Sequence, residues 1–135
     1  VSLFAAEPDV NQPIAIATDD RGRLWVAENY SYAERSTNYE DKLRDRIIIL
    51  EDTDQDGRFD ERKVFWDNGR RLTSVEIGYG GVWVTDAPNL LFIPDRDGDD
   101  VPDGDVGRGA ENGTNAALSP DGADTGRPGP GCAAP

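Results

Sequence analysis

The chain of 135 residues is strongly acidic, with 27 Asp and Glu against 14 Lys and Arg and a net charge of −13. Nucleic-acid binding is excluded as the expected function, because no basic stripe is present to contact phosphates. No apolar run reaches the roughly 20 residues that a membrane-spanning helix needs. The sequence has no histidine and a single cysteine, Cys132, which excludes an internal disulfide and a Cys-x-x-Cys-His haem attachment site.

Four short β-strands are predicted in the first half of the chain. Residues 13–18 and 24–29 contain short alternating apolar and polar runs, and the segment 19–23 between them has the composition of a hairpin turn. Residues 46–50 are apolar and rich in β-branched side chains, which favours a buried strand over a helix. Residues 62–66 add a fourth strand. Hairpin connections between successive strands predict an antiparallel meander.

The same order of elements restarts in the second half. Strands are predicted at 73–78, 82–84 and 90–93, with a Gly-containing turn at 79–81 between the first two. The run at 82–84 repeats the Trp-Val pair of the earlier strand, and the run at 90–93 repeats the apolar third strand. The second half is therefore predicted to be a second copy of the meander.

The spacing of the two copies predicts the fold class. Trp83 follows Trp25 by 58 residues, whereas the apolar run at Leu90 follows that at Ile47 by 43, which indicates an insertion between Trp25 and Ile47. A repeat of about 40–50 residues with four strands is typical of β-propeller blades. The prediction is all-β, a partial β-propeller of about two four-stranded antiparallel blades in residues 1–105. An ordinary β-sandwich is the alternative.

Aspartates follow the predicted third strand at the spacing of a calcium-binding loop, in residues 52–60, called here the first Asp loop. In such a loop, side-chain oxygens at positions one, three, five and nine and a main-chain carbonyl at position seven surround Ca²⁺. The predicted ligands are Asp52, Asp54, Asp56, Arg58 through its carbonyl, and Asp60. Gly57 at position six permits the left-handed backbone of a tight turn. A solvated acidic turn without metal is the alternative.

The second Asp loop, residues 95–103, repeats this spacing after the next apolar run. Its predicted ligands are Asp95, Asp97, Asp99, Val101 through its carbonyl, and Asp103. Glycine here stands at position four, Gly98, and position six is Asp100, a residue type that tolerates the left-handed region. The acidity of the chain is thus concentrated where metal is expected. Loops of this kind suit compartments with millimolar Ca²⁺, which favours an exported protein.

The predicted insertion, residues 29–45, interleaves tyrosines with charged and amide side chains. Long loops at the end of a propeller often line a ligand site, so this segment is a candidate ligand loop. The candidate residues are Glu28, directly before the segment, and Asn29, Tyr30 and Arg35 within it. The preferred alternative is a solvated surface loop whose tyrosines lie on the blade.

The repeat calls for a strand after Asp103, and the sequence indicates none. Residues 106–135 are rich in Gly and Pro and carry Leu118 as their only large apolar residue after Val106, which predicts a disordered tail. The missing strand leads to the hypothesis that this tail is an out-of-frame or artificial continuation. The start at Val1, without an initiator methionine or a signal peptide, predicts a processed or partial chain.

Three stretches together resemble a known bacterial family. They are residues 13–30, which include Gly22-Arg23-Leu24-Trp25-Val26-Ala27-Glu28-Asn29-Tyr30; residues 44–60, from Arg44-Asp45-Arg46-Ile47 through the first Asp loop; and residues 87–104, which begin Ala87-Pro88-Asn89-Leu90. Over about residues 2–105 the chain is similar to the amino-terminal propeller of the membrane-bound dehydrogenases of planctomycetes and related bacteria. Those proteins are similar to glucose and sorbosone dehydrogenases.

This resemblance implies an exported, periplasmic or cell-surface oxidoreductase that acts on a sugar or alcohol and is linked to pyrroloquinoline quinone (PQQ) or haem. It also implies that further blades, a histidine-bearing catalytic segment and a cytochrome segment belong to a longer protein. No catalytic or cofactor-binding residue is therefore assigned, and the chain is expected to be inactive alone. The alternative function is a calcium-stabilised binding or scaffold propeller module without catalysis.

Overall fold

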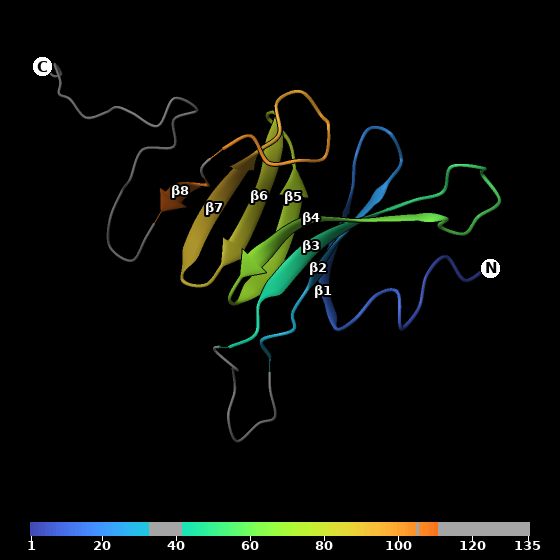
Figure 1. Ribbon diagram of the computed structural model, residues 1–135, viewed down its shortest axis with the longest axis horizontal. Helices are drawn as coiled ribbons and strands as arrows, with labels where there is room; N and C mark the ends of the chain where they lie inside the picture. Colours follow the sequence, from blue (N-terminus) through green and yellow to red (C-terminus); the bar gives the residue numbers. More distant parts are fainter. Residues whose placement is uncertain (33–41, 105, 111–135) are drawn as a thin grey trace, which may run out of the picture.

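The computed structural model describes residues 1–32, 42–104 and 106–110, and these form eight β-strands without a helix (Figure 1). The described residues accordingly contain no helix that is long and apolar enough to cross a membrane. The strands form two sheets, each built from four strands that are consecutive in the chain. The all-β class and the antiparallel meander that the sequence predicts are confirmed.

The first sheet has the order β1-β2-β3-β4, and all its neighbouring pairs are antiparallel. Its strands are β1 (Pro13–Thr18), β2 (Leu24–Glu28), β3 (Asp45–Glu51) and β4 (Glu61–Gly69). The alternation of side chains along β2 and β3 gives the sheet two apolar faces, because both inward and outward positions carry aliphatic or aromatic residues. A sheet of this composition must be covered on both sides.

The second sheet repeats this order as β5-β6-β7-β8. Its strands are β5 (Leu72–Ile77), β6 (Gly81–Asp86), β7 (Asn89–Pro94) and β8 (Gly107–Ala110). The expectation that no strand follows Asp103 is wrong, since β8 pairs with β7 and places Gly107 opposite Phe92. Ladder hydrogen bonds join main-chain groups, so a short Gly-rich segment can pair without large side chains. Residues 111–135, also predicted to be disordered, lie outside the described part.

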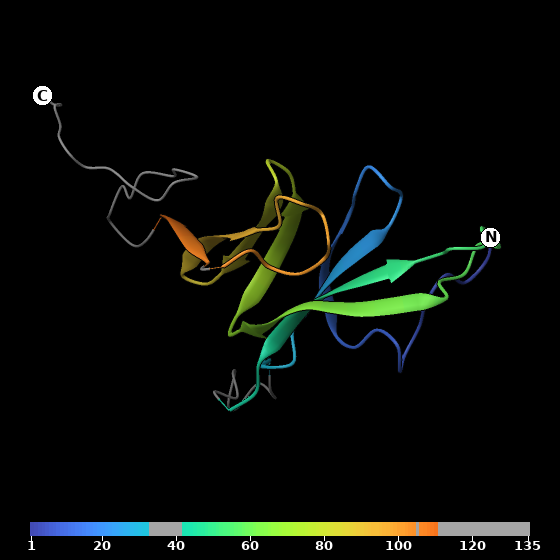
Figure 2. The same ribbon diagram turned by 45° about the horizontal axis from the view of Figure 1, so that its top comes forward.

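The two sheets lie side by side and share one hydrophobic core (Figure 2). Their most extensive contact joins β1 to β5, the first strand of each sheet. Trp25 anchors the core on the first sheet, where its ring meets that of Phe65 edge-on at a centroid distance of 5.0 Å. The core residues of the first sheet are Trp25, Ala27, Ile47, Ile49 and Phe65, and those of the second are Leu72, Val75, Val82, Val84, Leu91 and Ile93.

Each sheet has two faces that correspond between the copies. The Trp face carries Trp25, Ala27, Ile47 and Ile49 in the first sheet and Trp83, Thr85, Leu90 and Phe92 in the second; the aliphatic face carries Leu24, Val26, Ile48 and Leu50 in the first and Val82, Val84, Leu91 and Ile93 in the second. The Trp face of the first sheet packs against the aliphatic face of the second. The contact between the sheets is therefore head to tail, in the sense that it joins unlike faces of the two sheets.

The N-terminal segment covers the aliphatic face of the first sheet. Phe4, Ala5 and Val10 pack there against the buried side chains of that face, and the ring of Phe4 lies 6.4 Å from that of Phe59. The amide of Phe59 also donates to the carbonyl of Phe4 at 3.3 Å. Residues 1–12 thus complete a second, smaller core.

A carboxylate at the end of the second strand fixes the start of each sheet. Glu28 accepts a hydrogen bond from the amide of Asn11 at 2.7 Å, two residues before β1. Asp86, at the equivalent place in β6, accepts from the amides of Arg70 and Arg71 at 2.8 and 2.6 Å, just before β5. Buried carboxylates with main-chain donors are satisfied in place of water. The repeat therefore extends to polar contacts that the apolar pattern does not reveal.

Candidate functional site

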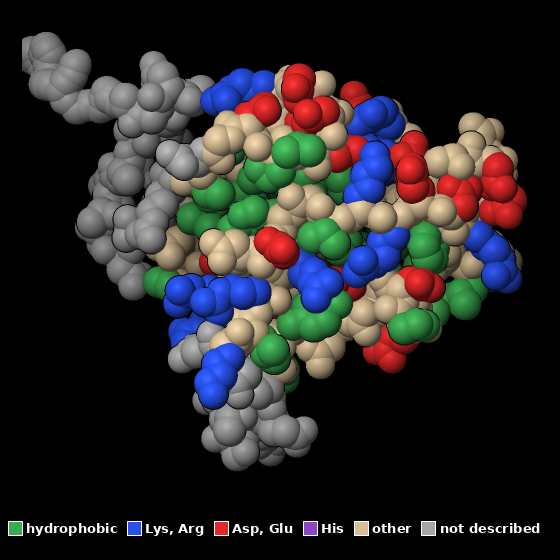
Figure 3. All heavy atoms as spheres, in the orientation of Figure 1, with side chains coloured by type: hydrophobic (Ala, Val, Ile, Leu, Met, Phe, Trp, Pro, Cys, Tyr) green, Lys and Arg blue, Asp and Glu red, His purple; other side chains and the backbone are tan. Residues whose placement is uncertain are grey.

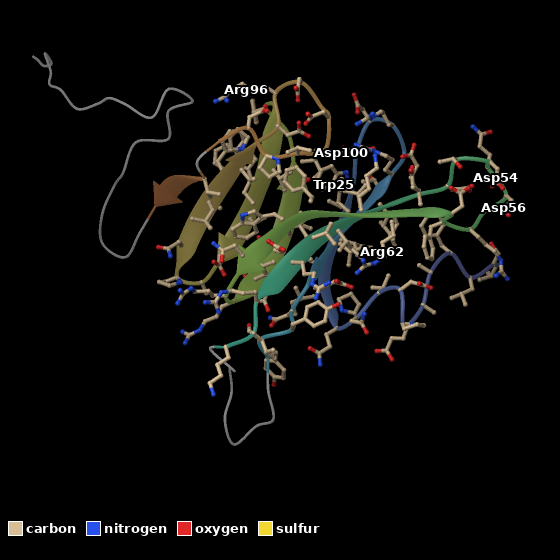
Figure 4. All side chains as sticks on the ribbon, viewed as in Figure 1. Trp25, Asp54, Asp56, Arg62, Arg96 and Asp100 are labelled. Atoms are coloured by element: carbon tan, nitrogen blue, oxygen red, sulfur yellow. The ribbon has the colours of Figure 1, made fainter. Side chains whose placement is uncertain are left out.

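The two Asp loops occupy equivalent places, each as the connection between the third and fourth strand of its sheet. This is the position that the sequence predicts for the first loop. In Figure 4, Asp54 and Asp56 stand at the outer end of the first loop, whereas Asp100 of the second loop lies between the sheets near Trp25. Figure 3 shows acidic side chains gathered along the upper edge and at the right end of the same view.

Hydrogen bonds from main-chain amides hold the first Asp loop in a tight turn. Asp52, at position one, accepts from the amides of Asp56 at 3.1 Å and Gly57 at 2.8 Å. Asp60, at position nine, accepts from the amide and hydroxyl of Thr53 at 3.1 and 2.6 Å. In addition, the amides of positions three, five and seven donate to the carboxylates of positions nine, three and five, respectively. The amide of position nine donates to the carbonyl of the residue before the loop.

The second Asp loop reproduces six of these hydrogen bonds at the same positions. Asp95 accepts from the amides of Asp99 at 3.1 Å and Asp100 at 3.2 Å, as position one does in the first loop. The amides of positions five, seven and two again donate to the carboxylates of positions three, five and nine, respectively. The amide of position nine again donates to the carbonyl of the residue before the loop. Two segments of different sequence thus adopt one conformation, which their shared aspartates determine.

Left-handed residues stand at positions four and six of both loops. In the first loop these are Gln55 with φ 61° and Gly57 with φ 91°, and in the second they are Gly98 with φ 70° and Asp100 with φ 68°. The left-handed conformation expected for Asp100 is confirmed. Each loop therefore has glycine at one of its two strained positions and a polar residue, which tolerates the strain less well, at the other.

Each loop gathers three carboxylates whose oxygens lie within 4.8 Å of one another. The two groups are Asp52, Asp54 and Asp60 in the first loop and Asp95, Asp97 and Asp99 in the second. Of the predicted aspartate ligands, Asp56 and Asp103 are outside these groups. Three converging carboxylates provide the hard oxygen donors that Ca²⁺ prefers.

The crowding of carboxylates is visible in their pKa values. Burial and the negative charges of Asp56 and Asp60 raise the pKa of Asp54. Burial, followed by the charges of Asp99 and Asp100, likewise raises the pKa of Asp95 above its ordinary value. Without a cation, both loops therefore hold one carboxylate whose ionisation the fold opposes. A bound cation removes this penalty.

Asp100 does not face its own loop, and sequence reasoning missed its role. Its side chain is 6% exposed and accepts hydrogen bonds from Arg23 and Lys63, both at 2.8 Å. Arg23 precedes β2 and Lys63 lies in β4, so both partners belong to the first sheet. Since burial acts against the charge of Asp100, its lowered pKa reflects the stronger opposite effect of these two donors. The only signal in the sequence is the departure from glycine at position six.

A cleft of about 510 Å³ lies beside this ion cluster. The β1–β2 turn, the β5–β6 turn and the second Asp loop form its walls, with Arg21, Tyr79 and Asp97 among the lining residues. Tyr79 is 94% exposed and adopts a left-handed φ of 58°. The second Asp loop thus borders both this cleft and a buried salt bridge, whereas the first loop is largely exposed.

The described residues of the candidate ligand loop make contacts within the protein. Glu28 is fully buried and accepts from the hydroxyl of Tyr30 at 3.1 Å, and the guanidinium of Arg46 stacks 4.4 Å from the ring centroid of Tyr30. The amide side chain of Asn29 donates to the carbonyl of Leu72 at 3.0 Å. These contacts join the segment after β2 to β3 and to the start of β5. Arg35, the fourth candidate, lies outside the described residues.

A buried polar network next to this loop was not anticipated. Asp45 is fully buried and accepts from the amide of Ser31 at 2.6 Å, its hydroxyl at 3.0 Å and the amide of Leu72 at 2.9 Å. The hydroxyl of Ser31 also contacts the carbonyl of Arg70. Because Leu72 begins β5, one carboxylate of the first sheet fixes the start of the second.

The fold and its loops define a class of protein: an all-β chain of two consecutive antiparallel sheets, each with an Asp-rich loop before its last strand. The family model that matches residues 1–108 is described as a domain of unknown function, DUF7133. It covers most of the chain, and the chain belongs to this family. No curated protein and no solved structure matches the chain.

Proposed function

We propose that the chain is a calcium-binding module of β-propeller type, in which each Asp loop holds one Ca²⁺ and stabilises the hairpin that carries it. The observation that supports this most is the common conformation of the two loops. Six equivalent hydrogen bonds orient the carboxylates, and each loop brings three of them within 4.8 Å. Amide donors occupy one side of these carboxylates and leave their remaining lone pairs for a cation.

The propeller is proposed on the packing of the sheets. The Trp face of the first sheet contacts the aliphatic face of the second, and the first strands β1 and β5 make the most extensive contact. Such head-to-tail contact can continue from sheet to sheet, as it does in propeller blades arranged around an axis. Hydrophobic side chains over β6 and β7 in Figure 3 agree with a second sheet that has further contacts to make.

Calorimetric titration of the EGTA-stripped protein with CaCl₂ tests the metal sites. We expect two Ca²⁺ per chain, a rise in the unfolding temperature, and a change in the fluorescence of Trp66, which lies in the strand after the first loop. The position-three variants Asp54→Ala and Asp97→Ala should each bind one Ca²⁺. The exposed control Asp67→Ala should bind two. Absence of Ca²⁺ uptake at millimolar concentration would contradict the proposal.

A second candidate function is oxidoreductase activity of a longer protein that contains this module. It is supported by the motifs within residues 2–105 that resemble the amino-terminal propeller of membrane-bound sugar dehydrogenases. In this proposal the module supplies scaffold, and PQQ- or haem-linked oxidation of a sugar or alcohol takes place in other parts. The test is sugar-dependent dye reduction by the full-length polypeptide with added PQQ. A lack of turnover with aldoses, ketoses and alcohols would leave the binding or scaffold function.

A further inference from the structure

The second Asp loop differs from the first in what its sixth position contacts. In the first loop this position is Gly57, and a Cβ added there would meet only the hydroxyl of Ser2, at 3.6 Å. In the second loop it is Asp100, whose carboxylate reaches Arg23 and Lys63 of the first sheet. Two loops of the same conformation thus have different surroundings, and only the second joins the sheets.

The contact between the second loop and the first sheet has two points. Asp100 binds Arg23 and Lys63 at 2.8 Å each, and its other oxygen lies 3.5 Å from the guanidinium of Arg21. Arg21 also donates to the carbonyl of Gly98, at position four of the loop, at 3.2 Å. Both left-handed residues of the loop are therefore held by arginines of the β1–β2 turn.

Arg23 is itself fixed in place. Its guanidinium donates to Asp19 at 2.8 Å and lies 5.7 Å from the ring centroid of Trp25, and its side chain is 4% exposed. The indole N–H of Trp25 donates to the same carboxylate at 2.9 Å. Asp100 therefore completes an ordered chain of polar groups that begins beside the central tryptophan of the core.

The metal ligands and this contact share main-chain atoms. Asp95 accepts from the amides of both Asp99 and Asp100, so the orientation of one carboxylate ligand sets the backbone from which the Asp100 side chain extends. Without a cation, repulsion within the group Asp95, Asp97 and Asp99 opposes this orientation. With a cation, the loop and the position of Asp100 are stabilised together.

We propose that metal binding in the second Asp loop is coupled to the docking of the two sheets, through Asp100 and Arg23. This inference rests on the proposed binding of Ca²⁺ and adds to it a division of roles. Metal in the second loop fastens the second sheet to the first, whereas metal in the first loop stabilises its own hairpin alone. Coupling is reciprocal, so weakening the Asp100–Arg23 contact lowers Ca²⁺ affinity in the second loop only.

Calcium titration of Arg23→Gln tests the reciprocal effect. We expect the wild-type protein to bind two Ca²⁺ and Arg23→Gln to weaken one of these sites by about tenfold, within the range of about 5- to 150-fold typical of coupled sites. Arg70→Gln, the matched loss of an exposed arginine, should leave both sites unchanged. Lys63→Gln removes the less buried partner and should give a smaller weakening of the same site. It carries the test if Arg23→Gln does not fold.

Hydrogen exchange of the Trp25 indole N–H, followed by NMR, reports sheet docking independently of affinity. Ca²⁺ should slow this exchange in the wild type and in Asp54→Ala, but not in Asp97→Ala. Equal weakening of both sites in Arg23→Gln, or loss of the Ca²⁺ effect in Asp54→Ala, would overturn the division of roles. Wild-type protein that takes up no Ca²⁺ would instead refute the proposed function, and with it the coupling.

Discussion

Replacement of Asp45 tests whether buried polar contacts, rather than the apolar core alone, hold the two sheets together. Asp45→Ala removes the acceptor of the amides of Ser31 and Leu72, at 2.6 and 2.9 Å. Both donors are buried, and an unsatisfied buried donor costs about 1–3 kcal/mol. The hydroxyl of Ser31 keeps the carbonyl of Arg70 as a partner. Because two such donors lose their acceptor, we expect the free energy of unfolding to fall by about 2–6 kcal/mol.

Urea unfolding measures this loss, with the midpoint and the slope recorded for each variant. Asp45→Asn keeps the shape of the side chain and one acceptor oxygen, so its free energy of unfolding should fall by about half as much as that of Asp45→Ala. Asp67→Ala removes an exposed aspartate of β4 and should change stability by no more than about 0.5 kcal/mol. If Asp45→Ala is as stable as Asp67→Ala, the network does not contribute to the docking of the sheets. If Asp45→Ala fails to fold, Asp45→Asn provides the comparison.

Two further predictions concern the turn regions. Burial raises the pKa of Asp19, but hydrogen bonds from Trp25 and Arg23 outweigh this effect and hold the pKa below its ordinary value of 3.8. The stability that Asp19 contributes is therefore full above pH 3.8 and is lost as the pH falls through the folded-state pKa. In Asp19→Asn, the unfolding temperature should consequently fall less steeply with decreasing pH in the acid range. Gly81→Ala places a Cβ 2.5 Å from the carbonyl of Ile93 and should cost about 1–3 kcal/mol in urea unfolding, whereas Gly78→Ala meets no atom within 4 Å and should be near neutral; equal losses would refute the steric argument.

The strands of the two sheets could be predicted because their apolar residues alternate or form short β-branched runs. The exception is β8, in which Gly107 pairs opposite Phe92 through main-chain groups that have no side-chain signature. Strand pairing at the edge of a sheet depends on a neighbour's free amides and carbonyls, and these are set by the fold. The alternation of apolar residues therefore predicts the strands that form the core, but it does not predict β8, which joins the edge of the second sheet through its main chain.

The candidate metal loops could be predicted because all their carboxylates lie within nine residues. The contacts of Asp100 could not, since Arg23 and Lys63 are 77 and 37 residues distant in the chain. Similarly, Glu28 and Asp45 were assigned to or beside a polar loop, yet both are fully buried. A polar residue is buried when distant donors converge on it, and a sequence pattern records the residue but not the donors.

The apolar faces that the two sheets share explain how the sheets pack, and residues that differ at equivalent positions explain the order in which they pack. Position for position, Gly81 in the second sheet corresponds to Arg23 in the first, and Gly57 in the first loop corresponds to Asp100 in the second. The salt bridge between Arg23 and Asp100 consequently has no equivalent at these positions. Apolar faces of similar composition bind one another with little discrimination, whereas a buried charge that finds no partner is strongly disfavoured. The common faces thus provide the driving force for stacking, and the ion pairs of Asp100 favour the order in which the second sheet follows the first.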